Sequence, residues 1–203
     1  MSDFTENLSG HRLAAKQYSA DYLARYAKIR NTTSWKFERQ QSFVEPGNDS
    51  WREFERGNWE KSLARSNERR GQLLAAARED AARGIDLYRV RVVAEPISSY
   101  LLWELNVLKV RAECGERIRV VDAELITEFE HEGKLPEILT LGDETVYQVI
   151  YDDSGALNGA IRSTDRADVE RWTLFIEELY RKGEEIDRFF ARRVAGRRPS
   201  SAA

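Results

Sequence analysis

The stretch LYRVRVVAEPISSYLLWELNVLKVRAECGERIRVVD, residues 87–122, constrains the fold more than any other part of the chain. Valines alternate along its first part, Pro96 then removes a backbone donor, and leucines follow at helical spacing until Gly115. The run RIRVV after that glycine is typical of a second short strand. Two such strands joined by one helix form a right-handed unit with parallel strands. We expect the Glu-Pro corner of this unit to open onto a groove.

Other patterns extend this unit on both sides. The segment SWKFERQQSFVEP alternates with the two-residue period of a strand that is solvated on one face. The segment ETVYQVIYDDSGALNGAIRS has the pattern of a hairpin with its turn at DDSG. A long helix is predicted to begin at Asp165, whose side chain can cap it. Together the patterns predict an α/β fold: a mixed sheet with a parallel strand–helix–strand unit and a late antiparallel hairpin, flanked by helices.

Length and composition fit one domain with short additions. The chain has 203 residues, of which 41% are hydrophobic and 33% charged, as in soluble proteins. Residues 1–32 have helical character and are predicted to form an N-terminal helical extension. The α/β domain is predicted over residues 33–195, and residues 196–203 are predicted to be a disordered tail. The polar N-terminus and the lack of a long apolar run favour a cytoplasmic protein without membrane contact.

Residues that carry most catalytic chemistry are scarce. The chain has one cysteine, Cys114, and two histidines, His11 and His131. It contains neither a phosphate-cradling glycine loop nor a Gly-x-Ser-x-Gly elbow. We therefore predict no cofactor and no metal site, and assign no catalytic residue. The net charge of −3 argues against broad attraction to nucleic acid or to acidic membranes.

Charged side chains near the Glu-Pro corner are the best candidates for a ligand or partner surface. Glu95 follows the first strand, where open α/β sheets bind their ligands. Arg91 and the first amides of the next helix could hold a small anionic ligand. In the alternative, Arg91 and Glu95 form an ion pair that stabilises the fold, and Glu104 lies on a solvated helix face. The full candidate set is Arg91, Glu95, Tyr100, Glu104, Asp152 and Arg162.

A small basic cluster lies near the C-terminal end. Arginines at a helix end complement the negative end of its dipole, so a solvated helix end is favoured over contact with an acidic partner or nucleic acid. The cluster consists of Arg188, Arg192, Arg193, Arg197 and Arg198.

Two stretches, RVRVVAEPISSYLLWELNVLKVRAECGERIRVV and VYQVIYDDSGALNGAIRSTDRADVERW, resemble a known family. They are similar to an actinobacterial family of uncharacterised proteins, the domain of unknown function 6879. The resemblance covers roughly residues 33–179 and leaves the first residues, roughly 1–30, outside the family pattern. Members of this family often lie beside, or are fused to, helix-turn-helix regulators. The resemblance therefore implies regulation or partner binding.

The order of elements is also similar in shape to one half of the phospholipase D-like fold. Enzymes of that fold need His-x-Lys-x-x-x-x-Asp, because the histidine takes the phosphoryl group. Here Lys134 follows His131 by three residues, and no acid stands where the motif requires one. The resemblance in shape therefore implies a binding platform without this catalysis.

The leading hypothesis is a cytoplasmic regulatory or interaction protein that partners a helix-turn-helix regulator or binds a small effector. The alternative is an enzyme that acts on a phosphate- or nucleotide-like substrate through carboxylates and arginines. Its acids would be Glu95, Glu104 and Asp152, and its anion contacts Arg91 and Arg162. That hypothesis requires these groups to share one cleft. Direct nucleic-acid binding by the basic cluster ranks last, because no recognition-helix pattern supports it.

Overall fold

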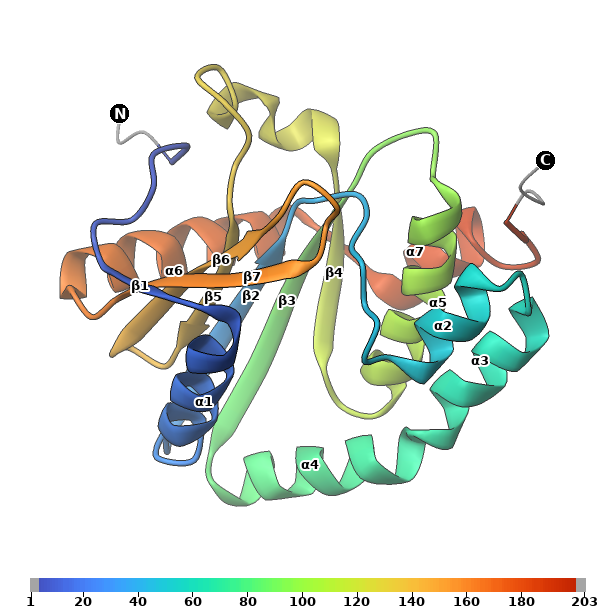
Figure 1. Ribbon diagram of the computed structural model, residues 1–203, viewed down its shortest axis with the longest axis horizontal. Helices are drawn as coiled ribbons and strands as arrows, with labels where there is room; N and C mark the ends of the chain where they lie inside the picture. Colours follow the sequence, from blue (N-terminus) through green and yellow to red (C-terminus); the bar gives the residue numbers. More distant parts are fainter. Residues whose placement is uncertain (1–3, 200–203) are drawn as a thin grey trace.

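A computed structural model describes residues 4–199 and places the strands in one eight-stranded sheet (Figure 1). The strand order is β1-β7-β6-β5-β2-β3-β4-β8. The pairs β2–β3 and β3–β4 are parallel and the other pairs antiparallel, which confirms the α/β class with a mixed sheet. The strands are β1 (His11–Leu13), β2 (Thr32–Glu38), β3 (Ile85–Val93), β4 (Arg117–Asp122), β5 (Glu137–Leu141), β6 (Thr145–Tyr151), β7 (Leu157–Ser163) and β8 (Glu184–Glu185). The helices are α1 (Ala15–Tyr26), α2 (Asp49–Glu55), α3 (Trp59–Glu68), α4 (Arg70–Ala82), α5 (Ser99–Glu113), α6 (Arg166–Lys182) and α7 (Ile186–Arg193), with the 3-10 helix η1 (Ala123–Phe129).

The predicted strand–helix–strand unit is present as β3, α5 and β4. The two strands pair in parallel, with Val92 opposite Val121. The side chain of Ser98 accepts a hydrogen bond from the Leu101 amide at 3.1 Å and so caps α5. Gly115 follows the helix with a φ of 113°, a conformation that favours glycine. Local capping chemistry therefore sets both ends of this unit, as the sequence indicated.

The late hairpin and the helix after it also follow the prediction. β6 and β7 pair antiparallel across a turn at residues 152–155. The Asp165 side chain accepts from the Ala167 amide at 2.7 Å and caps α6. The helix ends at Gly183, which is extended with a ψ of 154°, and β8 then pairs with β4. α7 begins after this short strand.

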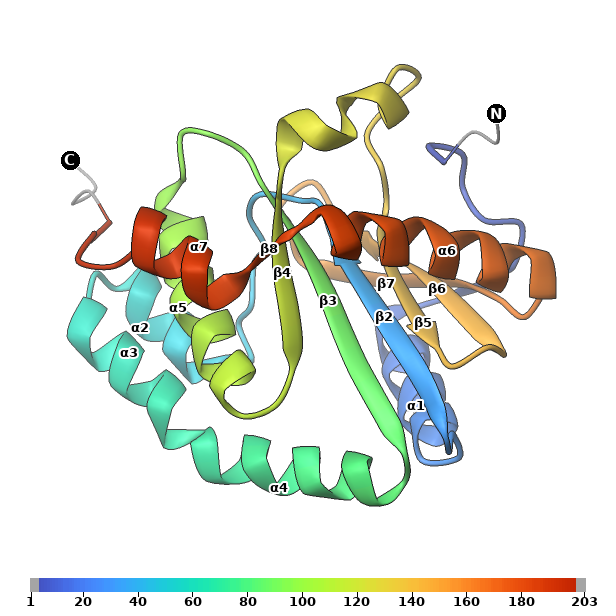
Figure 2. The ribbon, with the colours of Figure 1, turned by 180° about the vertical axis from the view of Figure 1, so that it is seen from behind.

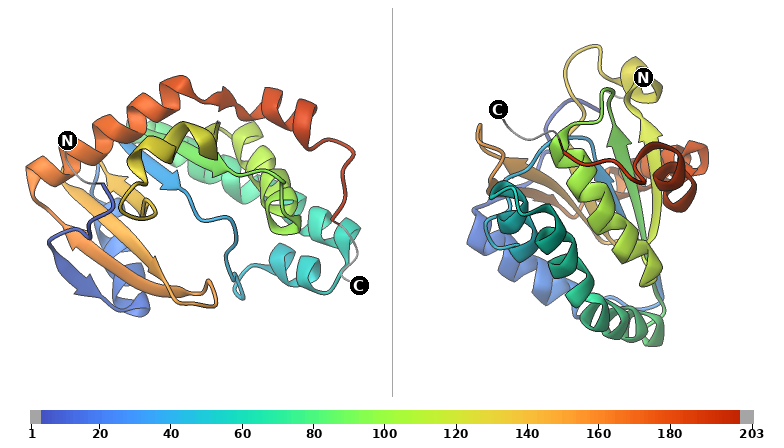
Figure 3. Two further views of the ribbon diagram at one scale, coloured as in Figure 1. Left: turned by 90° about the horizontal axis from the view of Figure 1, so that it is seen from above. Right: turned by 90° about the vertical axis from the view of Figure 1, so that its right-hand side faces the viewer.

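The two faces of the central strands differ because successive side chains point to opposite sides. Trp35 and Phe37 of β2 join Val90 and Val92 of β3 in the core beneath α6. Figure 2 shows α6 lying across this face, and Figure 3 shows α1, α2 and α3 on the opposite side. On that opposite face, apolar packing covers only the two ends of the sheet. Tyrosines of α1 pack over β5 and β6, and α5 packs over β4.

The middle of that face carries charges. Lys36 and Glu38 of β2 stand opposite Arg89 and Arg91 of β3 in the parallel register. The expectation of a solvated strand face is wrong for Glu38, which is only 5% exposed. The strand also ends at Glu38, earlier than the alternation suggested, and residues 39–48 cross the face as a loop before α2 (Figure 1).

The N-terminal segment contributes a strand as well as a helix. The predicted helix is present as α1, but β1 was not foreseen, and it pairs with β7 at the edge of the sheet. The division into an extension, residues 1–32, and a domain, residues 33–195, stays a prediction. So does the disordered tail, because residues 200–203 lie outside the described part of the chain. Within residues 4–199, no helix has both the length and the apolar character needed to cross a membrane.

Candidate functional site

A cleft of about 740 Å³ lies over the charged middle of the sheet. Its floor is formed by side chains of β2 and β3, including Lys36, Glu38 and Arg89. One wall comes from α5 and the other from the 39–48 loop and the β6–β7 hairpin, with side chains of α3 and α4 at the rim. The charged groups therefore lie between a rigid sheet and a packed helix, an arrangement that holds polar groups in fixed positions.

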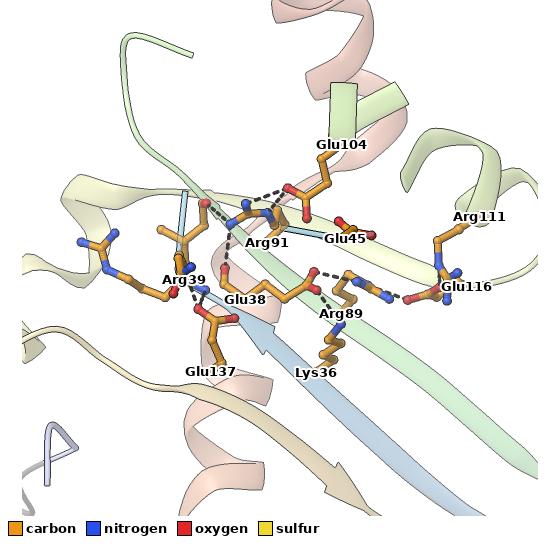
Figure 4. Close-up of polar contacts among 12 residues, drawn as sticks. Lys36, Glu38, Arg39, Glu45, Arg89, Arg91, Glu104, Arg111, Glu116 and Glu137 are labelled. Carbon is orange, nitrogen blue, oxygen red and sulfur yellow. Dashed lines mark hydrogen bonds and ion pairs between the residues drawn. The ribbon is translucent and has the colours of Figure 1, made fainter. Parts of the chain in front are cut away.

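The floor carries a chain of paired charges that runs across the sheet (Figure 4). Glu38 contacts Lys36 at 2.5 Å and accepts from Arg89 at 2.6 Å. Arg89 also donates to Glu116 at 2.6 Å, and Glu116 accepts from Arg111 of α5 at 2.7 Å. Burial opposes the ionisation of Glu38, but Arg89 and Lys36 outweigh it and lower its pKa. Burial likewise opposes the ionisation of Glu116, but the cations Arg89 and Arg111 outweigh it and lower the pKa of Glu116 to about 2.

A second ion pair joins Arg91 to Glu104 of α5. Arg91 is completely buried and Glu104 is 6% exposed. Both Nε and Nη2 of the guanidinium lie 2.7 Å from Oε2 of Glu104, and Nη1 donates to the Val92 carbonyl at 2.9 Å. Burial raises the pKa of Glu104 to about 7, and Glu38 and Glu45 add to this while Arg91 opposes it. The pair thus links the central strand to the helix that covers it.

Aromatic and carboxylate groups meet at one end of the cleft. The Tyr100 hydroxyl donates to Oε1 of Glu45 at 2.8 Å, which ties the 39–48 loop to α5. The ring of Phe43 lies 4.6 Å from that of Tyr151 and 6.0 Å from that of Tyr100, measured between centroids. This end therefore combines apolar ring surface with acidic groups.

Glu137 is a further buried carboxylate on the same face. It is 8% exposed, and its Oε1 accepts from the backbone amides of Arg39 at 2.8 Å and Gln40 at 2.6 Å. Burial and the nearby Glu38 raise its pKa to about 7. It lines a second cleft of about 720 Å³ beside the other edge of the crossing loop.

Glu137→Gln is expected to make stability less sensitive to pH. The pKa of Glu137 rises from 4.5 to about 7 on folding, so the folded state binds its proton more tightly. The stability from that proton is present below pH 4.5 and is lost as the pH rises through 7. Glutamine keeps the acceptor for both amides. Relative to wild type, the variant should therefore gain on the order of 1–3 kcal/mol between pH 5 and pH 8. Urea unfolding at both pH values measures this gain.

The matched control is Glu144→Gln, in the exposed turn between β5 and β6. It should leave the pH dependence of the wild type intact. An equal free-energy difference between Glu137→Gln and wild type at pH 5 and pH 8 would contradict the burial of a protonated Glu137.

The structure brings three of the six predicted site residues together, namely Arg91, Tyr100 and Glu104. Glu95 is exposed, outside the cleft lining, and paired with Arg193 of α7. Arg91 therefore pairs with Glu104 and not with Glu95, and Glu104 is buried instead of solvated. The corner that was expected to open onto a groove does not line the cleft.

The other two candidates lie elsewhere. Asp152 accepts from the Ser154 amide at 2.9 Å in the hairpin turn, and Arg162 pairs with Asp21 of α1 at 2.6 Å. The convergence that the enzyme hypothesis required is thus not met.

Most arginines of the basic cluster form ion pairs with carboxylates of the same chain. Besides the contact with Glu95, Arg192 pairs with Glu184 and Arg198 with Glu60.

Sequence reasoning missed most of the cleft floor. The available signal was the coincidence of two alternating strands, each with two charges on one face. The residues missed are Lys36, Glu38, Glu45, Arg89, Arg111 and Glu116.

Within the described residues, no group of three or more His, Cys, Asp or Glu side chains is placed to hold a metal ion.

Comparisons with known proteins identify a family. A family model described as a domain of unknown function (DUF6879) matches residues 21–191. The match begins inside α1, so the family region starts earlier than the resemblance suggested. No curated protein matches the chain. Among solved structures, TrmBL2, an archaeal chromatin protein described with a novel mode of DNA binding, is 12% identical with a TM-score of 0.42. That match covers 89% of this chain and 55% of the TrmBL2 chain, so this chain spans about half of its length.

Proposed function

This chain belongs to the family of the domain of unknown function DUF6879, and on that premise we propose that it is a cytoplasmic regulatory module that binds a small polar effector in the central cleft. The observation that carries this proposal is the cleft of about 740 Å³ whose floor is built from buried, paired charges. Ligand sites are concave and use a few fixed polar groups to orient the ligand. Here the sheet and α5 hold those groups.

The arrangement favours binding over catalysis. Charges that are already paired in a folded protein need little rearrangement when a ligand arrives, which lowers the ordering cost of binding. The floor carboxylates Glu38 and Glu116 are each held by two cations, so they are poorly placed to accept a proton from a substrate. Of the acids and arginines of the enzyme hypothesis, Glu104 and Arg91 pair with each other, while Glu95, Asp152 and Arg162 lie away from them.

The regulatory role and the helix-turn-helix partner are supported by the resemblance to the family described above. The actinobacterial origin has the same support, whereas the likeness to half of a phospholipase D-like fold is supported by the order of elements alone. All four stay predictions. Effector binding is the part of the proposal that the cleft itself supports, and it can be tested without the partner.

The test is a thermal-shift panel read against a variant that blocks the cleft. Leu157 lines the cleft and is 39% exposed, so Leu157→Trp should fill part of the opening. A ligand at about 100 times its Kd should raise the Tm of the wild type by about 5 °C. The panel comprises arginine, glutamate, spermidine, AMP, benzylamine, benzyl alcohol and benzoate. We expect at least one compound to stabilise the wild type, and Leu157→Trp to lose half or more of that shift.

Leu174→Trp is the matched control. Leu174 lies on α6, on the other face of the sheet, and is 55% exposed. This variant should keep the full shift of the wild type. A panel without any stabilising compound, or a shift that survives Leu157→Trp unchanged, contradicts an effector site in the cleft.

A further inference from the structure

We propose that the end of the cleft formed by Glu45, Glu104 and the rings of Phe43 and Tyr151 is a subsite for a cationic group, an amine or a guanidinium. The inference rests on the proposed function and deepens it, because it names the chemical class of the ligand. All four residues line the cleft. They come from the crossing loop, from α5 and from β6, so only the folded chain brings them together.

Two carboxylates converge at this end of the cleft. Tyr100 and Glu104 are four residues apart on α5 and therefore share one face of the helix. The Tyr100 hydroxyl holds Oε1 of Glu45 at 2.8 Å, which places the Glu45 carboxylate beside that face. Figure 4 shows the Glu45 and Glu104 carboxylates near each other below α5.

This end of the cleft has more negative than positive charge. Glu104 uses Oε2 for both of its contacts with Arg91, and within residues 4–199 no group donates to its Oε1. The Glu45 carboxylate accepts hydrogen bonds from the Tyr100 hydroxyl at 2.8 Å and from the Asn48 side-chain Nδ2 at 3.0 Å, both neutral donors. No Lys or Arg in the described chain pairs with Glu45.

The other carboxylates of the cleft floor are balanced by cations. Glu38 and Glu116 each contact two cations, as the paired chain on the floor requires. A carboxylate that is partly removed from water is stabilised by a nearby cation. Glu45 is half-buried beside the buried Glu104, and within the described chain no Lys or Arg pairs with it. A ligand cation would supply the missing charge.

The aromatic rings at this end of the cleft suit a cation. Phe43 and Tyr151 line the cleft, and the face of an aromatic ring attracts a cation within about 6 Å of its centroid. The Phe43 ring already has the Arg91 guanidinium 5.9 Å from its centroid. The pKa of Tyr151 is raised mainly by burial and then by Glu137 and Glu38, in keeping with acidic groups near its hydroxyl.

This assignment differs from the small anionic ligand that the sequence suggested. An anion at this end would face Glu45, Glu104 and Glu38 and would be repelled. Arg91, the residue expected to hold that anion, is already paired with Glu104 and completely buried.

The experiment compares three probes that share one ring and differ in charge. Benzylamine, benzyl alcohol and benzoate are titrated into the full chain by calorimetry at pH 8, where the amine is protonated and Glu104 is largely ionised. Benzylamine should bind with a Kd at least about tenfold lower than benzyl alcohol, and benzoate should bind most weakly. Glu45→Gln keeps an oxygen acceptor for Tyr100 but removes the charge. It should raise the Kd of benzylamine about fivefold or more and leave that of benzyl alcohol unchanged.

Glu68→Gln is the matched control, because Glu68 also lines the cleft but is exposed at the rim and paired with Arg65. It should bind benzylamine like the wild type. Glu104→Gln is a second probe of the subsite, although it also removes the counter-charge of Arg91.

Three results would overturn the inference: benzoate or benzyl alcohol binding as tightly as benzylamine, an unchanged benzylamine affinity in Glu45→Gln, or an equal loss in Glu68→Gln. If glutamate or AMP stabilises the wild type but not Leu157→Trp, while neither benzylamine, arginine nor spermidine binds, the cationic subsite fails and the effector cleft stands. If no panel compound gives that pattern, both proposals fail.

Discussion

Arg91→Met is expected to lower the free energy of unfolding by about 3–5 kcal/mol, because removing one partner of a buried ion pair leaves the other charge uncompensated. Glu104 is 6% exposed and would keep its place in the packed α5–sheet interface without a cation. The carbonyls of Glu38 and Val92 would also lose the donor that Arg91 provides. Urea unfolding near pH 7.5 measures the loss.

A double variant separates the missing charge from the missing contacts. Arg91→Met combined with Glu104→Leu should recover most of the stability, since an apolar pair of similar volume avoids the desolvation of both charges. Arg117→Met is the control, because its pair with Asp86 lies on the same sheet with both side chains about half exposed. That variant should lose less than about 1 kcal/mol. Equal losses in Arg91→Met and Arg117→Met would show that Arg91 and Glu104 are not a buried pair.

Gly159→Ala is expected to destabilise the protein by about 3 kcal/mol, through backbone strain and the displacement of β1. Gly159 lies in β7 with a φ of 118°, and a Cβ added there would lie 2.0 Å from the Leu13 carbonyl oxygen. The backbone of β1 would have to move away from β7. Chemical unfolding should show the loss, and hydrogen exchange should show faster exchange of the β1 amides.

Gly57→Ala is the control for the backbone strain alone. Gly57 also has a positive φ, 75°, but nothing lies within 4 Å of an added Cβ. This variant should lose only about 1 kcal/mol, the usual penalty for a non-glycine residue in the left-handed region. A loss in Gly159→Ala no larger than that in Gly57→Ala would show that β1 does not pack closely on β7.

The elements whose ends are set by neighbouring residues could be predicted from the sequence. Ser98, Gly115 and Asp165 act within one or two turns of the chain, so their roles could be predicted from neighbouring residues alone. The hairpin was predictable for the same reason, because its turn and its alternation lie in one continuous stretch.

The cleft could not be predicted in this way, because alternation shows which residues share a face but not what covers that face. Arg89 and Arg91 lie on one face of β3, yet their partners come from β2, α5 and the segment after α5. The partner of Arg91 is set by the packing of α5 over the sheet, and so Glu104 is buried instead of solvated. The strands β1 and β8, of three and two residues, are too short to leave a pattern and depend on partners far along the chain.

Amide chemical-shift mapping with the panel compound that most raises the Tm tests the central cleft most directly. The full chain, labelled with nitrogen-15, would be titrated and its amide signals followed. If the cleft is the ligand site, the largest shifts will fall in residues 43–50 and 103–111, which contribute its walls, and α6 will remain unchanged. Shifts centred on α6, or spread evenly over the surface, would contradict a ligand site on the charged face of the sheet.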